Sequence, residues 1–276
     1  MIIGGGPGGY EAALAGVQLG AEVTLIERNG IGGAAVLTDV VPSKTLIATA
    51  EAAQRVENAS ALGVKFSFAG QIVKPKVEID LASVNRRLLD LAESQSADML
   101  ETLMNAGVRV INGTARLDGN HHVVVDAIED GKSERMEAKT IIVAVGAHPR
   151  ELPDAKPDGE RIFTWTQLYN LTELPEHMIV IGSGVTGAEF ASAYNALGSK
   201  VSLISSRDKV LPGNDEDAAD LIEHVFRRNG TFFLRLRQLI SRSNHHQFLA
   251  LELGLHIQDV AFDAETVVKS LFDICS

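Results

Sequence analysis

The chain has 276 residues with 45% hydrophobic content, which is enough to bury the cores of one large or two medium domains. Its formal net charge of −11 argues against a nucleic-acid partner, because phosphate binding needs clustered Lys and Arg. Cys275 is the only cysteine, so an intramolecular disulfide and thiolate metal clusters are excluded. We expect a cytoplasmic protein with no metal site and no membrane span.

The first 28 residues, MIIGGGPGGYEAALAGVQLGAEVTLIER, predict a strand, a tight glycine turn, a helix and a second strand. Gly4, Gly6 and Gly9 form the GxGxxG spacing of a dinucleotide-binding loop. The first glycine permits the turn, the second lets the backbone approach a pyrophosphate, and the third lets helix and strand pack closely. The helix N-terminus then offers free N–H groups to the phosphates.

The middle of the chain predicts one long helix and a small sheet. Asp80 can cap the helix and Gly107 can end it. A strand follows at 108–111, and short alternating runs from 113 to 138 suggest an antiparallel meander. Residues 140–150, TIIVAVGAHPR, are expected to form a buried strand that ends at a domain edge.

A second segment, MIVIGSGVTGAEFASAYNALGSKVSLISSR, repeats the design of the first. Gly182, Gly184 and Gly187 have the same spacing as the GxGxxG glycines of the first segment. They again stand between an apolar run and an Ala-rich helix. Two copies at matching offsets make a βαβ unit without a nucleotide a poor alternative.

The two copies differ where their second strands end. Glu27 in the first copy can accept hydrogen bonds from ribose hydroxyls and repels a 2′-phosphate, as suits FAD. The second copy has Ser205, Ser206 and Arg207 instead, and an arginine can pair with a phosphate. The second loop is therefore expected to favour NADPH. The alternative is that Arg207 is a solvated surface charge and that NADH binds as well.

These patterns predict an α/β fold with two Rossmann-like dinucleotide-binding domains and a small antiparallel β-meander. Residues 1–150 would form the N-terminal segment of an FAD-binding domain, and residues 151–276 an NAD(P)-binding domain. Residues 231–276 change in character and depart from this pattern.

The two loops with Glu27 and Glu189, the PSK at 42–44 and the VAVGAHP at 143–149 resemble the flavoprotein pyridine nucleotide-disulfide oxidoreductases. The resemblance covers residues 1 to about 230. It is strongest to the actinobacterial NAD(P)H-quinone dehydrogenase branch, whose redox helix also opens with GGAAVL. It implies that FAD lies along the first domain and that NADP or NAD binds the second.

The resemblance also assigns the site residues. FAD-binding positions would be Gly4, Gly6, Pro7, Gly9, Glu27, Gly33, Ala34, Ala115, Ala144, Val145 and Gly146. NAD(P)H-binding positions would be Gly182, Gly184, Thr186 and Gly187, together with the Ser205, Ser206 and Arg207 discussed above.

Lys44 and Glu189 would form a catalytic pair beside the flavin, with Lys44 near flavin N5. A buried ammonium there stabilises negative charge that develops as hydride arrives, and a carboxylate partner offsets the cost of burying it. The alternative is that Lys44 is an ordinary exposed lysine on a helix.

Ala35 and Val40 stand where this family carries its two redox cysteines. Electrons would therefore pass directly from the flavin to a quinone-like acceptor on an apolar floor. A dihydrolipoyl dehydrogenase is disfavoured because it needs the cysteines. The remaining alternative is a non-catalytic, truncated nucleotide-binding remnant, because the family's second FAD-binding segment and its homodimerisation domain have no counterpart here.

Overall fold

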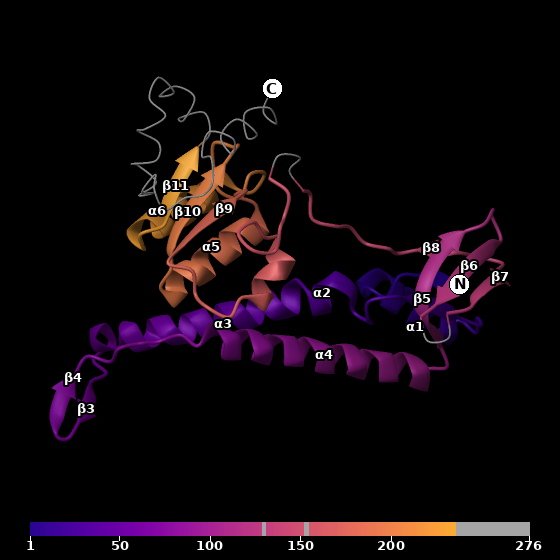
Figure 1. Ribbon diagram of the computed structural model, residues 1–276, viewed down its shortest axis with the longest axis horizontal. Helices are drawn as coiled ribbons and strands as arrows, with labels where there is room; N and C mark the ends of the chain where they lie inside the picture. The colour runs from indigo at the N-terminus through magenta and orange to yellow at the C-terminus, as the bar shows by residue number, and fades with distance from the viewer. Residues whose placement is uncertain (129–130, 152–154, 236–276) are drawn as a thin grey trace. The chain divides into compact units, whose positions relative to one another are not determined.

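The computed structural model describes residues 1–128, 131–151 and 155–235 (Figure 1). Two compact units make up the described chain. The first comprises Met1–Thr45 and Arg86–Pro149, and the second comprises Leu46–Asn85 and the described residues from Arg150 onward. The assignment of an FAD-binding domain to 1–150 and an NAD(P)-binding domain to 151–276 concerns ligands and stays a prediction.

The first unit is built on a six-stranded sheet in the order β7-β6-β5-β2-β1-β8. The strands β5, β2, β1 and β8 pair in parallel, whereas β5, β6 and β7 pair antiparallel. The long strand β5 belongs to both parts, because its first half pairs with β2 and its second half with β6. The strands are β1 (Ile2–Ile3), β2 (Thr24–Glu27), β5 (Arg109–Leu117), β6 (His122–Ala127), β7 (Ser133–Glu137) and β8 (Ile142–Val143).

Apolar residues line both faces of this sheet, as expected for parallel strands. Ile2 and Leu25 pack on one face with Ala13 of helix α1 (Pro7–Gln18) and Leu103 of helix α4 (Leu81–Asn105). A second cluster contains Ile3, Ile26, Val123 and Val125. Two further helices, α2 (Gly33–Leu37) and α3 (Val40–Glu57), follow β2 in the chain.

The long helix and the meander are confirmed. The Asp80 carboxylate accepts the Ser83 N–H at 3.0 Å at the start of α4, and Gly107 follows its end with a φ of +90°. The expected buried strand at 140–150 is wrong in length and burial. It is the two-residue strand β8, whose Ile142 and Val143 are 41% and 55% exposed. The reason is its edge position in the described sheet, where it pairs with β1 alone.

The second unit contains a three-stranded parallel sheet in the order β11-β10-β9 and a separate hairpin, β3-β4. Its helix α5 carries a mostly buried face with Phe190, Ala191 and Tyr194. Part of residues 231–276, predicted to depart from the family pattern, lies outside the described chain. The elements of this unit are η1 (Ala59–Leu62), β3 (Phe66–Phe68), β4 (Gln71–Val73), η2 (Trp165–Asn170), β9 (His177–Ile181), α5 (Val185–Leu197), β10 (Lys200–Ser205), α6 (Glu216–Arg228) and β11 (Phe232–Arg235).

Candidate functional site

In the first unit, the carboxyl ends of three parallel strands meet at one edge of the sheet. Gly4 follows β1 and its N–H donates to the Ile26 carbonyl of β2 at 2.8 Å. Ala144 follows β8 and its N–H donates to the Ile3 carbonyl at 2.8 Å. Ligands of open α/β sheets bind at such an edge, so the predicted FAD loop stands where the topology places a site.

Two of the loop glycines are required by the fold itself. Gly4 has a φ of +103°, and a Cβ there would lie 2.2 Å from the Ala144 carbonyl oxygen. A Cβ on Gly9 would lie 1.9 Å from the Gly4 carbonyl oxygen. Both distances are shorter than a carbon and an oxygen can approach without bonding, so a side chain at either position would force the backbone apart.

Gly6 is different, because the protein itself does not require a glycine there. Its φ is −67° with extended ψ, which any residue adopts. A Cβ on Gly6 would find only Gly33 Cα within 4 Å, at 3.9 Å. The space beside Gly6, at the start of helix α1, is thus what a closely approaching ligand would fill.

Glu27 has a structural role that the sequence did not reveal. Its carboxylate accepts the Gly5 N–H at 2.6 Å and the N–H groups of Arg28 and Asn29 at 2.8 and 2.7 Å. A side chain on Gly5 would crowd Glu27, since its Cβ would lie 3.0 Å from Glu27 Cγ. A carboxylate has about four lone-pair positions, so capacity for a ribose hydroxyl remains.

Some of the other predicted FAD positions lie near the loop, and three are described only by their place in the fold. Gly33 lies against the loop, since its Cβ would be 2.7 Å from Gly6 Cα, and Pro7 is the first residue of α1. Val145 is 64% exposed beside Gly4. The remaining three are the exposed Ala34 of α2, the half-buried Ala115 of β5 and the exposed Gly146 that follows β8.

The second loop has the geometry of the first. Gly182 has a φ of +110° and donates its N–H to the Ile204 carbonyl at 2.9 Å. A Cβ on Gly187 would lie 1.9 Å from the Gly182 carbonyl oxygen. Gly184 has a φ of −67° with extended ψ, and a Cβ there would meet nothing within 4 Å. Thr186, half-buried, is the second residue of α5.

Where the first copy pairs Gly5 with Glu27, the second pairs two serines. The buried hydroxyls of Ser183 and Ser205 lie 2.7 Å apart, and Ser205 Oγ also accepts the Arg207 N–H at 2.9 Å. Compared with the first copy, the strand end carries the smaller Ser205 in place of Glu27, and the turn carries Ser183 in place of Gly5. This pair therefore has no negative charge. Ser206 and Arg207 are exposed, and Arg207 makes no ion pair with the described residues.

The two residues predicted to be catalytic belong to different units. Lys44 is exposed on α3 in the first unit, and Glu189 is half-buried on α5 in the second. Their pairing stays a prediction. Ala35 is half-buried on α2, and Val40, which begins α3, is 47% exposed.

Neither a metal site nor a membrane-spanning helix occurs among the described residues. No group of three or more His, Cys, Asp or Glu side chains that could hold a metal ion occurs among them. None of the described helices has the length and apolar character needed to cross a membrane.

Comparison with known proteins identifies the class. Residues 1–269 match the model of the pyridine nucleotide-disulphide oxidoreductase family, so the chain belongs to this family of flavin oxidoreductases. Enzymes of the family use FAD and take electrons from NAD(P)H. The α/β fold with Rossmann-like dinucleotide-binding units is therefore confirmed.

Two curated relatives show how similar the chain is to individual members of the family. An NAD(P)H dehydrogenase (quinone) of Mycobacterium tuberculosis is 45% identical over 238 residues, which is 83% of this chain and 47% of that protein. A dihydrolipoyl dehydrogenase of Zymomonas mobilis is 34% identical over 230 residues, with the same coverage of each chain. The chain thus spans about half the length of the curated relatives it matches.

Solved structures of related proteins have a similar fold. LpdA from Mycobacterium tuberculosis matches with a TM-score of 0.76 and 44% identity, over 85% of this chain and 50% of that one. The HOCl-induced flavoprotein disulfide reductase RclA from Escherichia coli matches with a TM-score of 0.66 and 25% identity, over 85% and 48% of the two chains.

Proposed function

We propose that this protein is an FAD-dependent oxidoreductase that takes hydride from NAD(P)H, with NADPH preferred, and passes electrons directly to a quinone-like acceptor. The proposal rests on Gly6 and Gly184. Each is a glycine at a place where the protein itself leaves room for a side chain, and each stands at the start of a helix. A nucleotide phosphate that approaches the backbone explains both.

The residues fit FAD at the first loop and a nicotinamide nucleotide at the second. Free N–H groups at the start of α1 would receive the pyrophosphate of FAD, and Glu27 would accept from its ribose. The equivalent groups of α5 would receive the pyrophosphate of NAD(P)H. Two features support the preference for NADPH: no carboxylate stands at Ser205, and the Arg207 guanidinium makes no ion pair with the residues that the structure describes.

The chemistry of electron transfer belongs to the flavin, which accepts hydride at N5 and reduces an acceptor when bound. The chain supplies position and charge. Lys44 would hold an ammonium near N5, and Glu189 would pair with it. Ala35 and Val40 would leave an apolar floor on which an aromatic acceptor can stack. The M. tuberculosis relative's name, NAD(P)H dehydrogenase (quinone), favours the same acceptor class.

A two-substrate assay tests this function. The protein is reconstituted with FAD, and oxidation of NADPH or NADH is followed with a benzoquinone or with lipoamide as acceptor. We expect quinone-dependent oxidation, faster with NADPH than with NADH, and no lipoamide turnover. Turnover with lipoamide would refute the direct transfer, and equal or better use of NADH would refute the nucleotide preference.

One observation favours a second function, nucleotide binding without catalysis. Ile142 and Val143 of β8, and Val145 just after it, are exposed near the predicted FAD loop. A site that is open on this side holds flavin weakly. Purified protein that lacks the flavin absorption bands and cannot be reconstituted by FAD would support this alternative over the enzyme.

A further inference from the structure

The segment 206–211 follows β10 and carries the proposed 2′-phosphate ligands, Ser206 and Arg207. Two hydrogen bonds join it to Ser183, in the turn after β9. The Ser183 hydroxyl donates to the Lys209 carbonyl at 3.2 Å, and the Leu211 N–H donates to the Ser183 carbonyl at 2.7 Å. Leu211 has a φ of +52°, a conformation that a non-glycine residue keeps only when its surroundings hold it.

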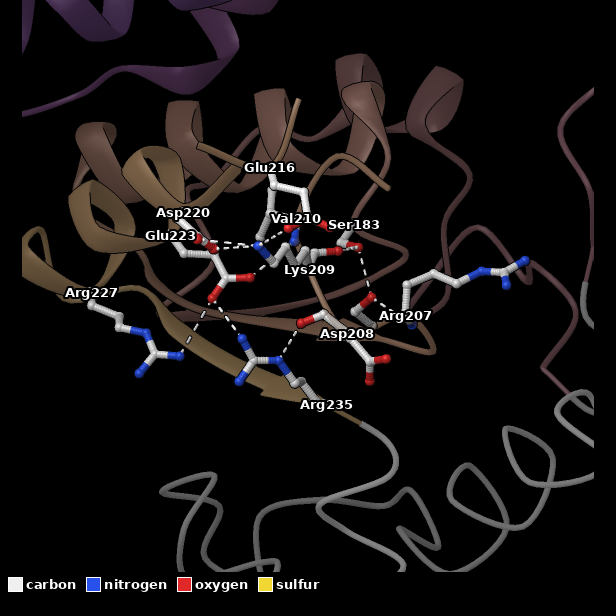
Figure 2. A network of polar contacts seen from close by, with 11 residues as sticks. Ser183, Arg207, Asp208, Lys209, Val210, Glu216, Asp220, Glu223, Arg227 and Arg235 are labelled. Carbon is white, nitrogen blue, oxygen red and sulfur yellow. Dashed lines mark hydrogen bonds and ion pairs between the residues drawn. The ribbon is translucent and has the colours of Figure 1, made fainter. Parts of the chain in front are cut away.

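The third anchor comes from helix α6. Glu223 is only 6% exposed, and its carboxylate accepts the N–H of the fully buried Val210 at 3.1 Å. Figure 2 shows this carboxylate at the centre of a network, with the Arg235 guanidinium 2.9 Å away and that of Arg227 3.6 Å away. The Arg235 Nε also donates to the Asp208 carbonyl of the same segment.

Lys209 holds the outer side of the segment. Its ammonium lies 3.0 Å from Asp220 and 3.5 Å from Glu216, both of α6 (Figure 2). Arg207 is the exception, because its side chain points away from this network and makes no ion pair with the described part of the chain. Hydrogen bonds and ion pairs therefore hold residues 208–211 in place, and Arg207 presents a guanidinium that has no ion pair among the described residues.

In the first copy, the segment after the second strand is held in a different way. There the strand-end carboxylate of Glu27 itself holds the following segment through the N–H groups of Arg28 and Asn29, and Gly32 donates to the Gly5 carbonyl at 2.8 Å. That arrangement puts a negative charge at the ribose. In the second copy the carboxylate that supports the segment stands on α6, away from the strand end.

We infer that Glu223 is a positioning residue for nucleotide specificity: it holds segment 206–211 so that Arg207 meets the 2′-phosphate, while the strand end carries Ser205 and no carboxylate. This inference rests on the proposed preference for NADPH. It assigns Glu223 no contact with the nucleotide, so its effect must pass through Arg207.

Calorimetric titration of the full chain with ADP-ribose and with its 2′-phosphorylated form tests the inference without flavin or acceptor. We expect the unmodified protein to bind the phosphorylated form more tightly. Glu223→Gln should reduce this ratio by about 2- to 140-fold, the range of coupling energies between interacting residues. The affinity for ADP-ribose itself should hardly change.

A double-mutant cycle separates positioning from general damage. Arg207→Ala should lose the preference, and Arg207→Ala combined with Glu223→Gln should lose no more than Arg207→Ala alone. Asp217→Asn is the matched control, because it removes an exposed carboxylate from the first turn of the same helix and should leave the ratio unchanged. Glu223→Asp serves as a second variant if Glu223→Gln unfolds, since it keeps the charge but withdraws the carboxylate from the Val210 N–H.

The outcomes distinguish the two proposals. A protein that prefers the phosphorylated ligand and keeps this preference in folded Glu223→Gln or Glu223→Asp overturns the role of Glu223 alone. Additive losses in the double variant also overturn it. An unmodified protein that binds both ligands equally overturns the NADPH preference, and the inference about Glu223 falls with it.

Discussion

Alanine at Gly184 and at Gly187 should separate binding from folding within one loop. A Cβ on Gly187 would lie 1.9 Å from the Gly182 carbonyl oxygen, so helix α5 and strand β9 must move apart. Overpacking of this kind costs about 1–3 kcal/mol. For a protein of this size the melting temperature should then fall by about 2–12 °C.

Gly184→Ala should behave in the opposite way. With nothing within 4 Å of its Cβ and an ordinary φ of −67°, the free energy of unfolding should stay within about 0.5 kcal/mol of the parent value. The new methyl group would instead keep a phosphate from the backbone. Losing one hydrogen bond to a charged group costs about 1.5–3 kcal/mol, which raises the Kd for ADP-ribose by about 10- to 100-fold.

Urea denaturation and calorimetric titration of both variants measure these effects. The reasoning is refuted if Gly184→Ala is destabilised as much as Gly187→Ala. It is also refuted if Gly184→Ala is stable and binds ADP-ribose with unchanged affinity, because the glycine would then serve neither the fold nor a ligand.

The remaining predictions concern the first loop, one histidine and the proposed catalytic lysine. Gly9→Ala should lose about 1–3 kcal/mol of stability, because its Cβ would lie 1.9 Å from the Gly4 carbonyl oxygen, whereas Gly8→Ala meets open space and should gain up to about 1 kcal/mol in thermal unfolding. Burial, with a smaller effect of Lys200, lowers the pKa of His177 below its usual 6.5. The unfolded chain therefore binds the proton first, and the free energy of unfolding should fall as the pH drops below about 6.5, less so in His177→Gln. Lys44→Ala should slow flavin reduction by NADPH in stopped-flow absorbance; an unchanged rate would remove Lys44 from the mechanism.

The glycine loops could be predicted because their geometry is local. The positive φ of Gly4 and Gly182 and the close approach of Gly9 and Gly187 are fixed by a strand that turns into a helix. The spacing alone carries that information. The long helix α4 was equally readable, since its apolar period, its cap and its terminal glycine all lie within one segment.

The length and burial of the strand at 140–150 could not be predicted from the sequence, because burial depends on neighbouring strands that the segment does not encode. Its apolar run is typical of a central parallel strand, yet Ile142 and Val143 lie at an edge of the described sheet. The anchor at Glu223 was equally hidden. A glutamate on an amphipathic helix is typical of a solvated face, and only the return of residues 208–211 toward α6 makes it a buried acceptor.

The sequence by itself determined the class of protein and the two glycine loops, and it predicted that Ala35 and Val40 replace the redox cysteines. Each of these depends on residue type at fixed spacing along the chain. Tertiary structure decided which of those residues touch. Gly4 meets Ala144 across a separation of 140 residues, and Glu223 of helix α6 reaches Val210 in the segment after β10. Such contacts arise from sheet order and helix packing, which spacing along the chain does not encode.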